Sequence, residues 1–319
     1  MAHDGSHHGS SEHVLADPRT LAQLEIAISR HLGSTWQCTS MVDLAHLASH
    51  PSAVLVGRVE PSGARVRVFA KHSCAIEAAE QFRTEVLGLR VLHDRGGIRT
   101  PAPVGDGVVE VPGGAVLLLD AVDAVARGEE QWRDIGRTLA RLHSVRGTAY
   151  GFDADGWFGP LPLDNRPLPG ASWTEFYVER RVRPRLAEAT AAGHLRADVA
   201  RRVERLLDDL PASVVLPDES PALLHGDAQQ NNFISTAAGA VAIDPAVQFG
   251  HPELDLAMVD YFAPVPHALF AGYRELRPID GGFEARREIW RLHVHLAVIA
   301  VAGPEYVPRL VATLDSITR

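Results

Sequence analysis

The sequence contains little of what marks several large classes of protein. Its 319 residues include only two cysteines, Cys38 and Cys74, and neither belongs to a CxxC pair, which argues against a disulfide framework and against a cysteine-ligated zinc site. No window approaches eighteen uninterrupted apolar residues, and the first residues contain no apolar stretch of the signal-peptide kind. We therefore expect a cytoplasmic protein with no membrane partner.

Lysine is almost missing as well. The chain has 31 basic residues, and Lys71 is its only lysine. A lysine ammonium is a compact charge on a thin stem, whereas a guanidinium is a broad planar fork. A site that must place an ammonium between phosphate oxygens and a carboxylate cannot easily accept arginine. Lys71 is therefore a candidate functional residue.

The charge balance bears on possible partners. The formal net charge is −9, and the arginines are scattered among acidic residues without forming a basic stripe. Duplex nucleic acid is therefore not an expected partner. An acidic surface tolerates or attracts a cationic small molecule. The composition is ordinary for a globular protein, with 46% apolar residues, and the length suits two lobes.

The first part of the chain alternates between strand-like and helical patterns. Residues 1–13 hold four histidines among Gly and Ser, and we expect a disordered tail over residues 1–17. Residues 18–120 should form a nucleotide-binding lobe of sheet and helix. Its expected elements are a helix at 18–32, strands at 53–59 and 65–70, a helix at 76–95, and strands at 104–111 and 115–119.

From residue 121 to 319 the pattern is mostly helical, so the predicted class is α+β. Residues 151–171 hold four prolines and four glycines and should be a loop. Helices are expected at 131–144, 173–192, 197–210, 253–262, 266–276, 283–301 and 305–317, and short strands at 222–224, 233–234 and 240–243.

The strongest chemical signal lies in this short β region. Residues 224–232 read LHGDAQQNN, and residues 243–246 read IDPA. Phosphoryl transfer needs a carboxylate to orient a hydroxyl and accept its proton, and oxygen ligands to hold Mg²⁺. The spacing of Asp227, Asn232 and Asp244 predicts that all three lie at one rim of a small β ribbon.

These residues resemble a known superfamily. The stretch from His225 to Asn232 matches the H-G-D-x-x-x-x-N loop of aminoglycoside phosphotransferases, and Asp244 matches their second aspartate motif. The resemblance is closest to the fructosamine (ketosamine) kinase branch and covers roughly residues 35 to 300. It rests further on FRTEVLGL at 82–89, GRTLARLH at 136–143, YGF at 150–152, WFGP at 157–160, DN at 164–165, WTEF at 173–176, RRVRP at 180–184 and FGHPELDLAM at 249–258.

The resemblance implies a protein-kinase-like two-lobed fold and an ATP- and Mg²⁺-dependent kinase. It implies that Lys71 contacts the nucleotide phosphates and pairs with Glu85, and that Asp227 is the catalytic base. Asn232 and Asp244 would hold Mg²⁺, while His225 and Asp255 would brace the catalytic loop. The connector that would offer backbone hydrogen bonds to adenine consists of Leu119, Asp120, Ala121 and Val122.

The sequence departs from this pattern at two places. Fructosamine kinases usually carry Leu-Trp directly after the catalytic Asp, whereas this chain has Ala228 and Gln229. The expected nucleotide loop at 44–52 holds no glycine, so either it stands off from the phosphates or the hydroxyls of Ser49 and Ser52 contact them. The residues considered for acceptor binding are Gln229, Trp173 and Glu253.

Three functions remain open at this point. The chain phosphorylates a ketosamine or related amino sugar, it phosphorylates an antibiotic, or it binds nucleotide without catalysis. The intact set of Asp227, Asn232 and Asp244 argues against the third. The first two functions use the same chemistry. The sequence does not separate them, because the acceptor is bound by the variable helical lobe. The sequence does not indicate an oligomeric state.

Overall fold

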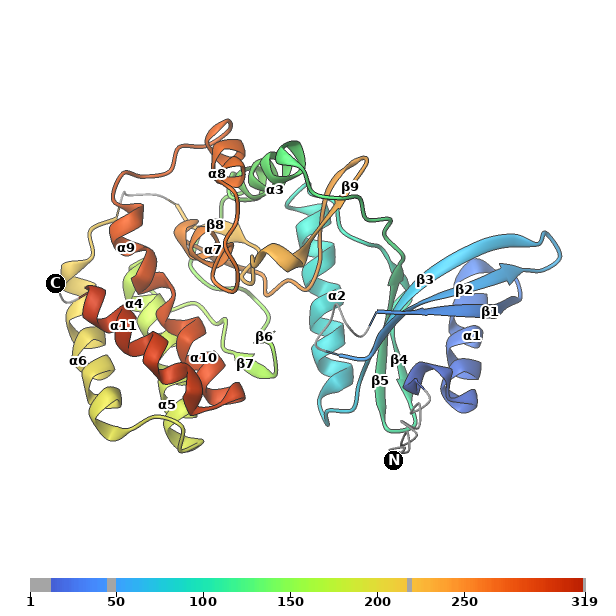
Figure 1. Ribbon diagram of the computed structural model, residues 1–319, viewed down its shortest axis with the longest axis horizontal. Coiled ribbons are helices and arrows are strands. Elements are labelled where there is room, and N and C mark those ends of the chain that lie inside the picture. Colours follow the sequence, from blue (N-terminus) through green and yellow to red (C-terminus); the bar gives the residue numbers. More distant parts are fainter. Residues whose placement is uncertain (1–12, 45–49, 217–219, 318–319) are drawn as a thin grey trace, which may run out of the picture. The chain divides into compact units, whose positions relative to one another are not determined.

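A computed structural model describes residues 13–44, 50–216 and 220–317 (Figure 1). The chain divides into two compact units, one comprising Met1–Val86 with Pro101–Val122 and the other comprising Leu87–Thr100 with Asp123–Arg319. The predicted boundary after residue 120 lies close to the point between Val122 and Asp123 where the chain passes from the first unit to the second. The sequence pattern assigns 87–100 to the first lobe, whereas Val91 and Leu92 are buried in the core of the second unit.

The first unit is built on a five-stranded antiparallel sheet. Its strands are β1 (Trp36–Asp43), β2 (Ser52–Val59), β3 (Ala64–Ser73), β4 (Pro103–Val111) and β5 (Gly114–Asp120), in the order β1-β2-β3-β5-β4. The predicted strands and the hairpin are confirmed. β1 carries no clear apolar alternation and was not predicted. The pairing with β2 along one edge of the sheet, rather than its own pattern, makes it a strand.

The two faces of this sheet have different roles. Helix α1 (Pro18–Leu32) begins at Asp17, whose side chain accepts hydrogen bonds from two backbone amides, and ends at Gly33 in the left-handed conformation. Its apolar stripe packs with Val68 and Ala70 of β3 in one core. Because side chains alternate along a strand, Lys71 points to the opposite face. There it meets Glu85 of helix α2 (Ala78–Asp94).

The described end of the expected tail is ordered. Residues Val14–Ala16 form a 3₁₀ turn whose Leu15 is completely buried in the same core as α1. The prediction of disorder therefore fails for residues 13–17, because one apolar side chain anchors them; residues 1–12 lie outside the described part. Both thiols, Cys38 and Cys74, are free, as expected.

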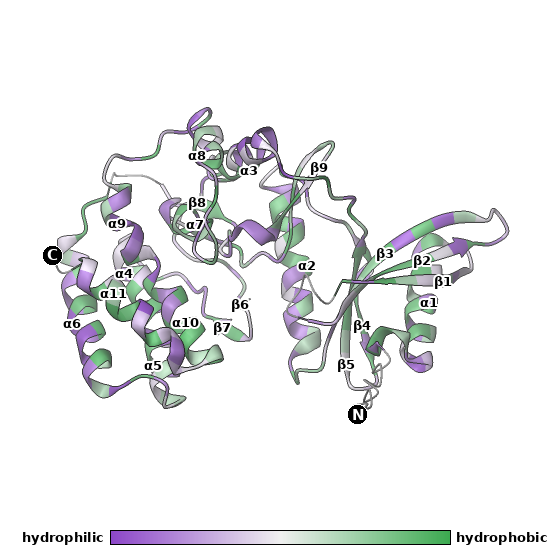
Figure 2. Ribbon diagram, in the orientation of Figure 1, coloured by the Kyte–Doolittle hydropathy of each residue, from purple (hydrophilic) through white to green (hydrophobic). Residues whose placement is uncertain are grey.

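The second unit is mainly helical (Figure 1). Its α-helices are α3 (Glu129–Leu142), α4 (Trp173–Tyr177), α5 (Arg183–Ala191), α6 (Ala197–Ser213), α7 (Glu253–Met258), α8 (His267–Arg274), α9 (Phe283–Trp290), α10 (Leu292–Ala302) and α11 (Val307–Ile317). A π-helical turn, Val178–Val182, joins α4 to α5, so the predicted helix over 173–192 is continuous but irregular. Figure 2 shows α10 coloured mostly as hydrophobic, and it lies in the core of this unit.

Helices α3 and α8 pack so closely that side chains are excluded between them. A Cβ on Gly136 of α3 would lie 1.9 Å from the carbonyl oxygen of Leu269 in α8, and one on Gly272 would lie 2.0 Å from that of Arg133. Glycine at both positions therefore allows the two backbones to touch. This contact brings the end of α3 beside Tyr273.

Short strands complete the second unit. The β8 strand (Ala222–Leu224) pairs with β11 (Gln248–Gly250), and β9 (Phe233–Thr236) pairs with β10 (Gly239–Ala242). The amide of Ala242 donates to the carbonyl of Arg99 at 2.9 Å, which ties the segment 87–100 to this unit. Within the expected loop at 151–171, β6 (Gly156–Phe158) and β7 (Leu161–Leu163) form a small hairpin. The sequence predicted only a loop here, because Gly159 and Pro160 in the turn are typical loop residues and the two strands are only three residues long.

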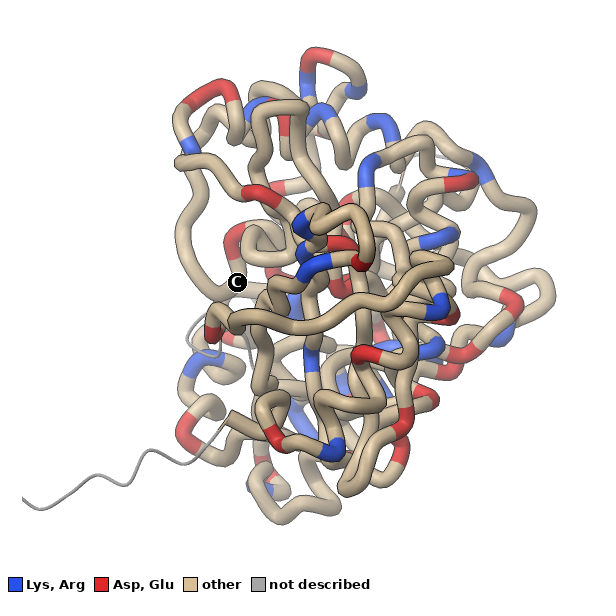
Figure 3. The backbone as a smooth tube through the Cα atoms, turned by 90° about the vertical axis from the view of Figure 1, so that its right-hand side faces the viewer, with Lys and Arg blue, Asp and Glu red and all other residues tan. Residues whose placement is uncertain are grey.

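Charge and apolar character can also be followed along the described chain. Charged residues of both signs are interspersed along the backbone (Figure 3). Among the helices of the described part, none combines the length and apolar character that a membrane span requires.

Candidate active site

The loop from His225 to Asp227 is a tight turn that only glycine permits. It follows β8, whose three residues are all buried. Gly226 has φ +81°, and a Cβ there would lie 1.8 Å from the carbonyl oxygen of Ala246. The amide of Ala246 in turn donates to the carbonyl of His225 at 2.8 Å. The chain segment after Asp244 is therefore locked against the loop that carries Asp227.

A buried carboxylate holds this loop in place. Asp255 of α7 is fully buried and accepts hydrogen bonds from the amides of His225 (2.8 Å) and Gly226 (2.9 Å). It also accepts one from Nε2 of His143 (3.0 Å), whose Nδ1 lies 2.9 Å from the hydroxyl of Tyr273. The geometry supports the bracing role that the resemblance implies for Asp255. The sequence predicts His143 only as a packed helix residue, although its place at the end of the GRTLARLH stretch at 136–143 could have signalled its part in the brace.

His225 braces the same loop by its side chain. Its ring is fully buried, with Nε2 3.0 Å from the carbonyl oxygen of Ile243, and its Nδ1 accepts the amide of Asp227 at 3.3 Å. Burial lowers the pKa of this imidazole. A neutral ring that donates from Nε2 and accepts at Nδ1 matches both contacts. His225 therefore links Asp227 to the strand that precedes Asp244.

Asp255→Ala is expected to lower the free energy of unfolding by about 3 kcal/mol, because two buried backbone amides lose their acceptor. Activity should fall further than stability explains, since the turn that carries Asp227 loses its support. Thermal unfolding and turnover of the variant would be compared with those of Asp209→Ala, which changes an exposed position on α6. A variant with the unfolding temperature of the parent protein would contradict this bracing role.

Asp227 itself is poised as a proton acceptor. Burial, reinforced by the negative charge of Asp244, raises the pKa of its carboxyl to about 7. Oδ1 is buried and has no hydrogen-bond partner among the described residues, while Oδ2 receives a long contact of 3.4 Å from Nε2 of Gln229. A buried carboxylate oxygen without a donor is costly unless a ligand completes it.

Asn232 and Asp244 lie on the ribbon next to Asp227. The side-chain nitrogen of Asn232 donates to the backbone carbonyl of Asp227 at 2.8 Å, and the backbone carbonyl of Asn232 accepts the amide of Ile243 at 2.9 Å. Asp244 has φ +50°, the only positive φ outside glycine in the described chain. Such strain is typical of functional positions held by their surroundings. The structure thus brings together the three residues whose spacing predicted one rim.

The other predicted cluster lies within the first unit. Nζ of Lys71 is 2.9 Å and 2.7 Å from the two carboxylate oxygens of Glu85, and it lies 5.6 Å from the ring centre of Phe82. The lysine is 8% exposed. The predicted pairing of Lys71 with Glu85 is therefore present, on the sheet face away from α1.

The predicted adenine connector is partly exposed. Leu119 is buried at the end of β5, and the amide of Asp120 donates to the carbonyl of Ala102 at 2.8 Å. The backbone amides of Ala121 and Val122 donate to no acceptor within the described ranges. Of the predicted nucleotide loop, Ser52 is buried with its hydroxyl on the carbonyl of His50, while Ser49 lies outside the described residues.

Two of the residues considered for acceptor binding are buried in the core. Trp173 is 2% exposed and stacks in the core with Phe176. Glu253 is 3% exposed, and its carboxylate is occupied by Arg286 and by the indole nitrogen of Trp290 at 2.7 Å. Both side chains are therefore engaged by neighbours within the core, which their sequence surroundings did not indicate. Gln229, the third candidate, is half-buried beside Asp227.

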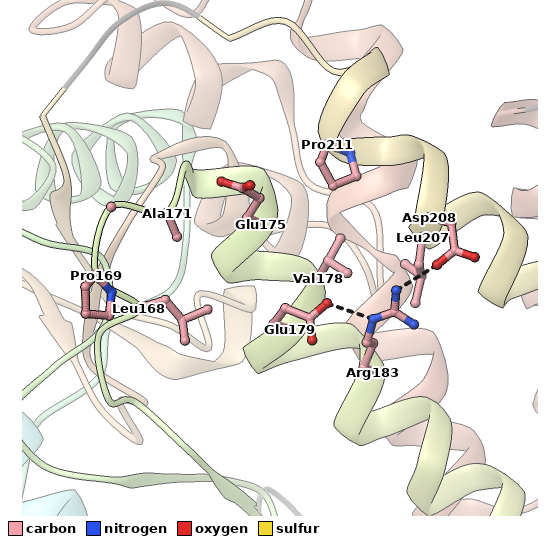
Figure 4. A pocket seen from close by; sticks show the side chains of 11 residues that line it. Leu168, Pro169, Ala171, Glu175, Val178, Glu179, Arg183, Leu207, Asp208 and Pro211 are labelled. Carbon is pink, nitrogen blue, oxygen red and sulfur yellow. Dashed lines mark hydrogen bonds and ion pairs between the residues drawn. The ribbon is translucent and has the colours of Figure 1, made fainter.

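A separate pocket of about 520 Å³ lies on the outer side of α4 and α6 (Figure 4). It combines apolar side chains such as Leu168 and Leu207 with an Arg183 that bridges Glu179 and Asp208. None of the predicted site residues lines it. The candidate site at the loop of Asp227 is therefore distinct from this pocket.

The fold and these residues define a class of protein. A five-stranded sheet with a buried Lys–Glu pair, and a helical unit with an aspartate on a tight loop and a second aspartate beside it, are the parts of protein-kinase-like phosphotransferases. The model of the fructosamine kinase family matches residues 27–319, and the chain belongs to that family. It is thus a kinase that transfers phosphate to a hydroxyl group, and the family implies ATP as donor.

Individual relatives agree with this assignment. A probable ketoamine kinase of Synechocystis is 32% identical over 220 residues, which cover 67% of this chain and 70% of that protein. A chloroplastic protein-ribulosamine 3-kinase of rice (subspecies indica) is 29% identical, covering 75% and 69% of the two chains.

Solved structures give the same result. The crystal structure of a protein from Thermobifida fusca assigned as a fructosamine-3-kinase has 31% identity and a TM-score of 0.76, covering 93% of this chain and 98% of that one. An aminoglycoside phosphotransferase shares the fold alone, with 13% identity and a TM-score of 0.57 over 92% and 97% of the chains. The predicted α+β, protein-kinase-like fold and the predicted family are confirmed.

Proposed function

We propose that this kinase phosphorylates a hydroxyl of a small ketosamine in the cytoplasm, with Asp227 as the catalytic base. The observation that supports the base most directly is a carboxylate with one buried, unpartnered oxygen, carried on a turn that Asp255 and His225 hold rigid. A pKa near 7 suits a base that must accept a proton at neutral pH.

In the proposed step, the acceptor hydroxyl oxygen attacks the γ-phosphorus of ATP. The bond from that phosphorus to the oxygen bridging the β- and γ-phosphates breaks, ADP leaves with the electron pair, and Asp227 takes the hydroxyl proton. Little covalent chemistry falls to the protein, so its main contributions are orientation and charge stabilisation. The rigid mounting of Asp227 provides the orientation.

Asn232 and Asp244 fit the Mg²⁺ that such kinases use. Mg²⁺ is usually held by one or two carboxylates together with substrate phosphates and water, rather than by a cage of protein ligands. That mode agrees with the described residues, among which no group of three or more His, Cys, Asp or Glu side chains converges. The ion would neutralise phosphate charge, and the repulsion between Asp227 and Asp244 is what a cation here would relieve.

For the nucleotide, we propose that Lys71 binds the phosphates and that Glu85 holds its ammonium group in place. The pair is mostly shielded from water, with side-chain exposures of 10% and 13%. The half-buried connector residues Ala121 and Val122 would offer the adenine backbone hydrogen bonds, with Leu119 and Asp120 fixing the end of the strand before them.

The acceptor class follows from the relatives named ketoamine and ribulosamine kinases. Purified protein with ATP and Mg²⁺ would be offered fructosamines and ribulosamines of simple amines, and in parallel an aminoglycoside panel. Mass spectrometry should show a phosphate-sized mass gain on the sugar amines. Phosphorylation of antibiotics alone would refute the ketosamine assignment, and ATP turnover with no acceptor in either set would refute both.

A further inference from the structure

We propose that Gln229 and Asp227 together recognise an α-hydroxy ketone, with the Gln229 amide binding the ketone oxygen while Asp227 accepts the neighbouring hydroxyl. This inference rests on the proposed function and adds to it a residue that selects the acceptor. A ketosamine contains this unit, because its carbonyl carbon is bonded to a carbon that bears a hydroxyl.

The backbone around Gln229 is fixed on both sides. Its carbonyl accepts the amide of Asn232 at 2.9 Å, and the side chain of Asn232 binds the carbonyl of Asp227 at 2.8 Å. Ala228 between them is completely buried. The side chains of Asp227 and Gln229 therefore project from the same rigid turn and lie next to each other. A ligand that contacts one of them also contacts the other.

The contact between the two side chains can be replaced. Nε2 of Gln229 lies 3.4 Å from Oδ2 of Asp227, beyond the usual range of about 2.7–3.2 Å for an N–H···O bond. Gln229 is half-buried and so can be reached by a ligand. Its amide oxygen has no hydrogen-bond partner within the described ranges. A ligand can thus take the position of this weak bond at little cost.

The polarity of the pair matches the acceptor unit. A carboxylate only accepts hydrogen bonds, which suits a hydroxyl, and an amide nitrogen only donates, which suits a ketone oxygen. Two oxygens on neighbouring carbons lie roughly 3 Å apart, about one hydrogen-bond length. That separation is close to the distance from Oδ2 to Nε2, so both contacts can form at once. A flat apolar ring at position 229 would stack on the sugar instead.

The test compares two acceptors and two matched variants. The acceptors are the fructosamine of propylamine and an analogue in which a methylene group replaces its ketone. Gln229→Met keeps the length of the side chain and removes its hydrogen bonds. Gln230→Met makes the same change at the adjacent residue, where Nε2 of Gln230 faces the carbonyl of Ala263 and not Asp227. Values of kcat/KM for all combinations form a double-mutant cycle.

We expect the parent protein and Gln230→Met to prefer the ketone by roughly 10- to 100-fold, because a site built to donate a hydrogen bond rejects an analogue without the acceptor atom. Gln229→Met should use both acceptors at similar, low efficiency. Gln229→Glu, which replaces the donor by an acceptor, should lose the preference as well. Unchanged melting temperatures would confirm that the variants fold.

Two outcomes overturn the inference in distinguishable ways. If the parent protein phosphorylates the fructosamine but Gln229→Met retains the preference for the ketone, the role of Gln229 alone is refuted. If the parent protein phosphorylates neither acceptor, the proposed function fails and the inference fails with it.

Discussion

Asp227→Asn is expected to reduce kcat by roughly 10³-fold while leaving the fold intact, because an amide cannot accept the proton of the acceptor hydroxyl. The substitution preserves the shape of the side chain. The backbone contacts of Asp227 with His225 and Asn232 do not involve the carboxylate, so they persist. The loss should therefore appear in turnover and not in the secondary structure.

The same variant makes a prediction about stability in the nucleotide-free protein. The pKa of Asp227 is raised from 3.8 to about 7, so the folded protein binds this proton more tightly than the unfolded chain does. The associated stability is present below pH 3.8 and is lost as the pH rises through about 7. Above pH 7 the parent protein bears a buried charge that Asp227→Asn lacks, and the variant should melt at the same or a higher temperature.

Steady-state kinetics with saturating ATP and circular dichroism at pH 8 would check both statements. Asp209→Asn serves as the control, because it makes the same chemical change at an exposed position on α6. Turnover within threefold of the parent value in Asp227→Asn would show that another group is the base. A sharply lowered melting temperature would show instead that the carboxylate is a structural anchor.

Lys71→Arg is expected to lower kcat/KM for ATP by roughly 10²-fold, although the positive charge is retained. Lys71 is 8% exposed and is held between Glu85 and the ring of Phe82. A guanidinium is broader than an ammonium and presents its donors in a fixed plane. It can form a bidentate pair with Glu85, but its donors then point at the carboxylate and not at phosphate oxygens.

ATP titration with a saturating acceptor would measure this effect. Arg65→Lys, at an exposed position of the same strand, is the reciprocal control and should leave kcat/KM unchanged. Lys71→Met removes the charge and should be at least as impaired as Lys71→Arg. Normal use of ATP by Lys71→Arg would mean that the site needs only a positive charge, and the argument from the solitary lysine would be lost.

Much of the fold was predictable because its signals are local. The helix at 18–32 follows from apolar spacing and is bounded by an Asp cap and a Gly stop, and the structure places it over the same residues. The strand that carries Lys71 alternates visibly, and the short strands around the loop of Asp227 are continuous apolar runs. Where a three-residue strand is flanked by Gly and Pro, as in β6 and β7, no local pattern is long enough to detect.

The active-site residues divide in the same way. The proximity of Asp227, Asn232 and Asp244 could be predicted because these residues lie in one short stretch of the chain with recognisable types and spacing. The burial of Trp173 and Glu253 was not predicted, because burial depends on distant partners. Glu253 meets Arg286 and Trp290, which follow more than thirty residues later. His143 was undervalued for the same reason, since its partner Asp255 lies 112 residues away.

By itself, the sequence determined the class of fold, the kinase family and the candidate groups for the chemistry, since these depend on periodicity and on residue types at close spacing. Only the tertiary structure decided which polar side chains remain available to a ligand. Folding brings residues from elsewhere in the chain next to a carboxylate or an indole, and these neighbours decide whether its polar atoms are already hydrogen-bonded. Buried polar groups rarely stay unpaired, because leaving them so is costly.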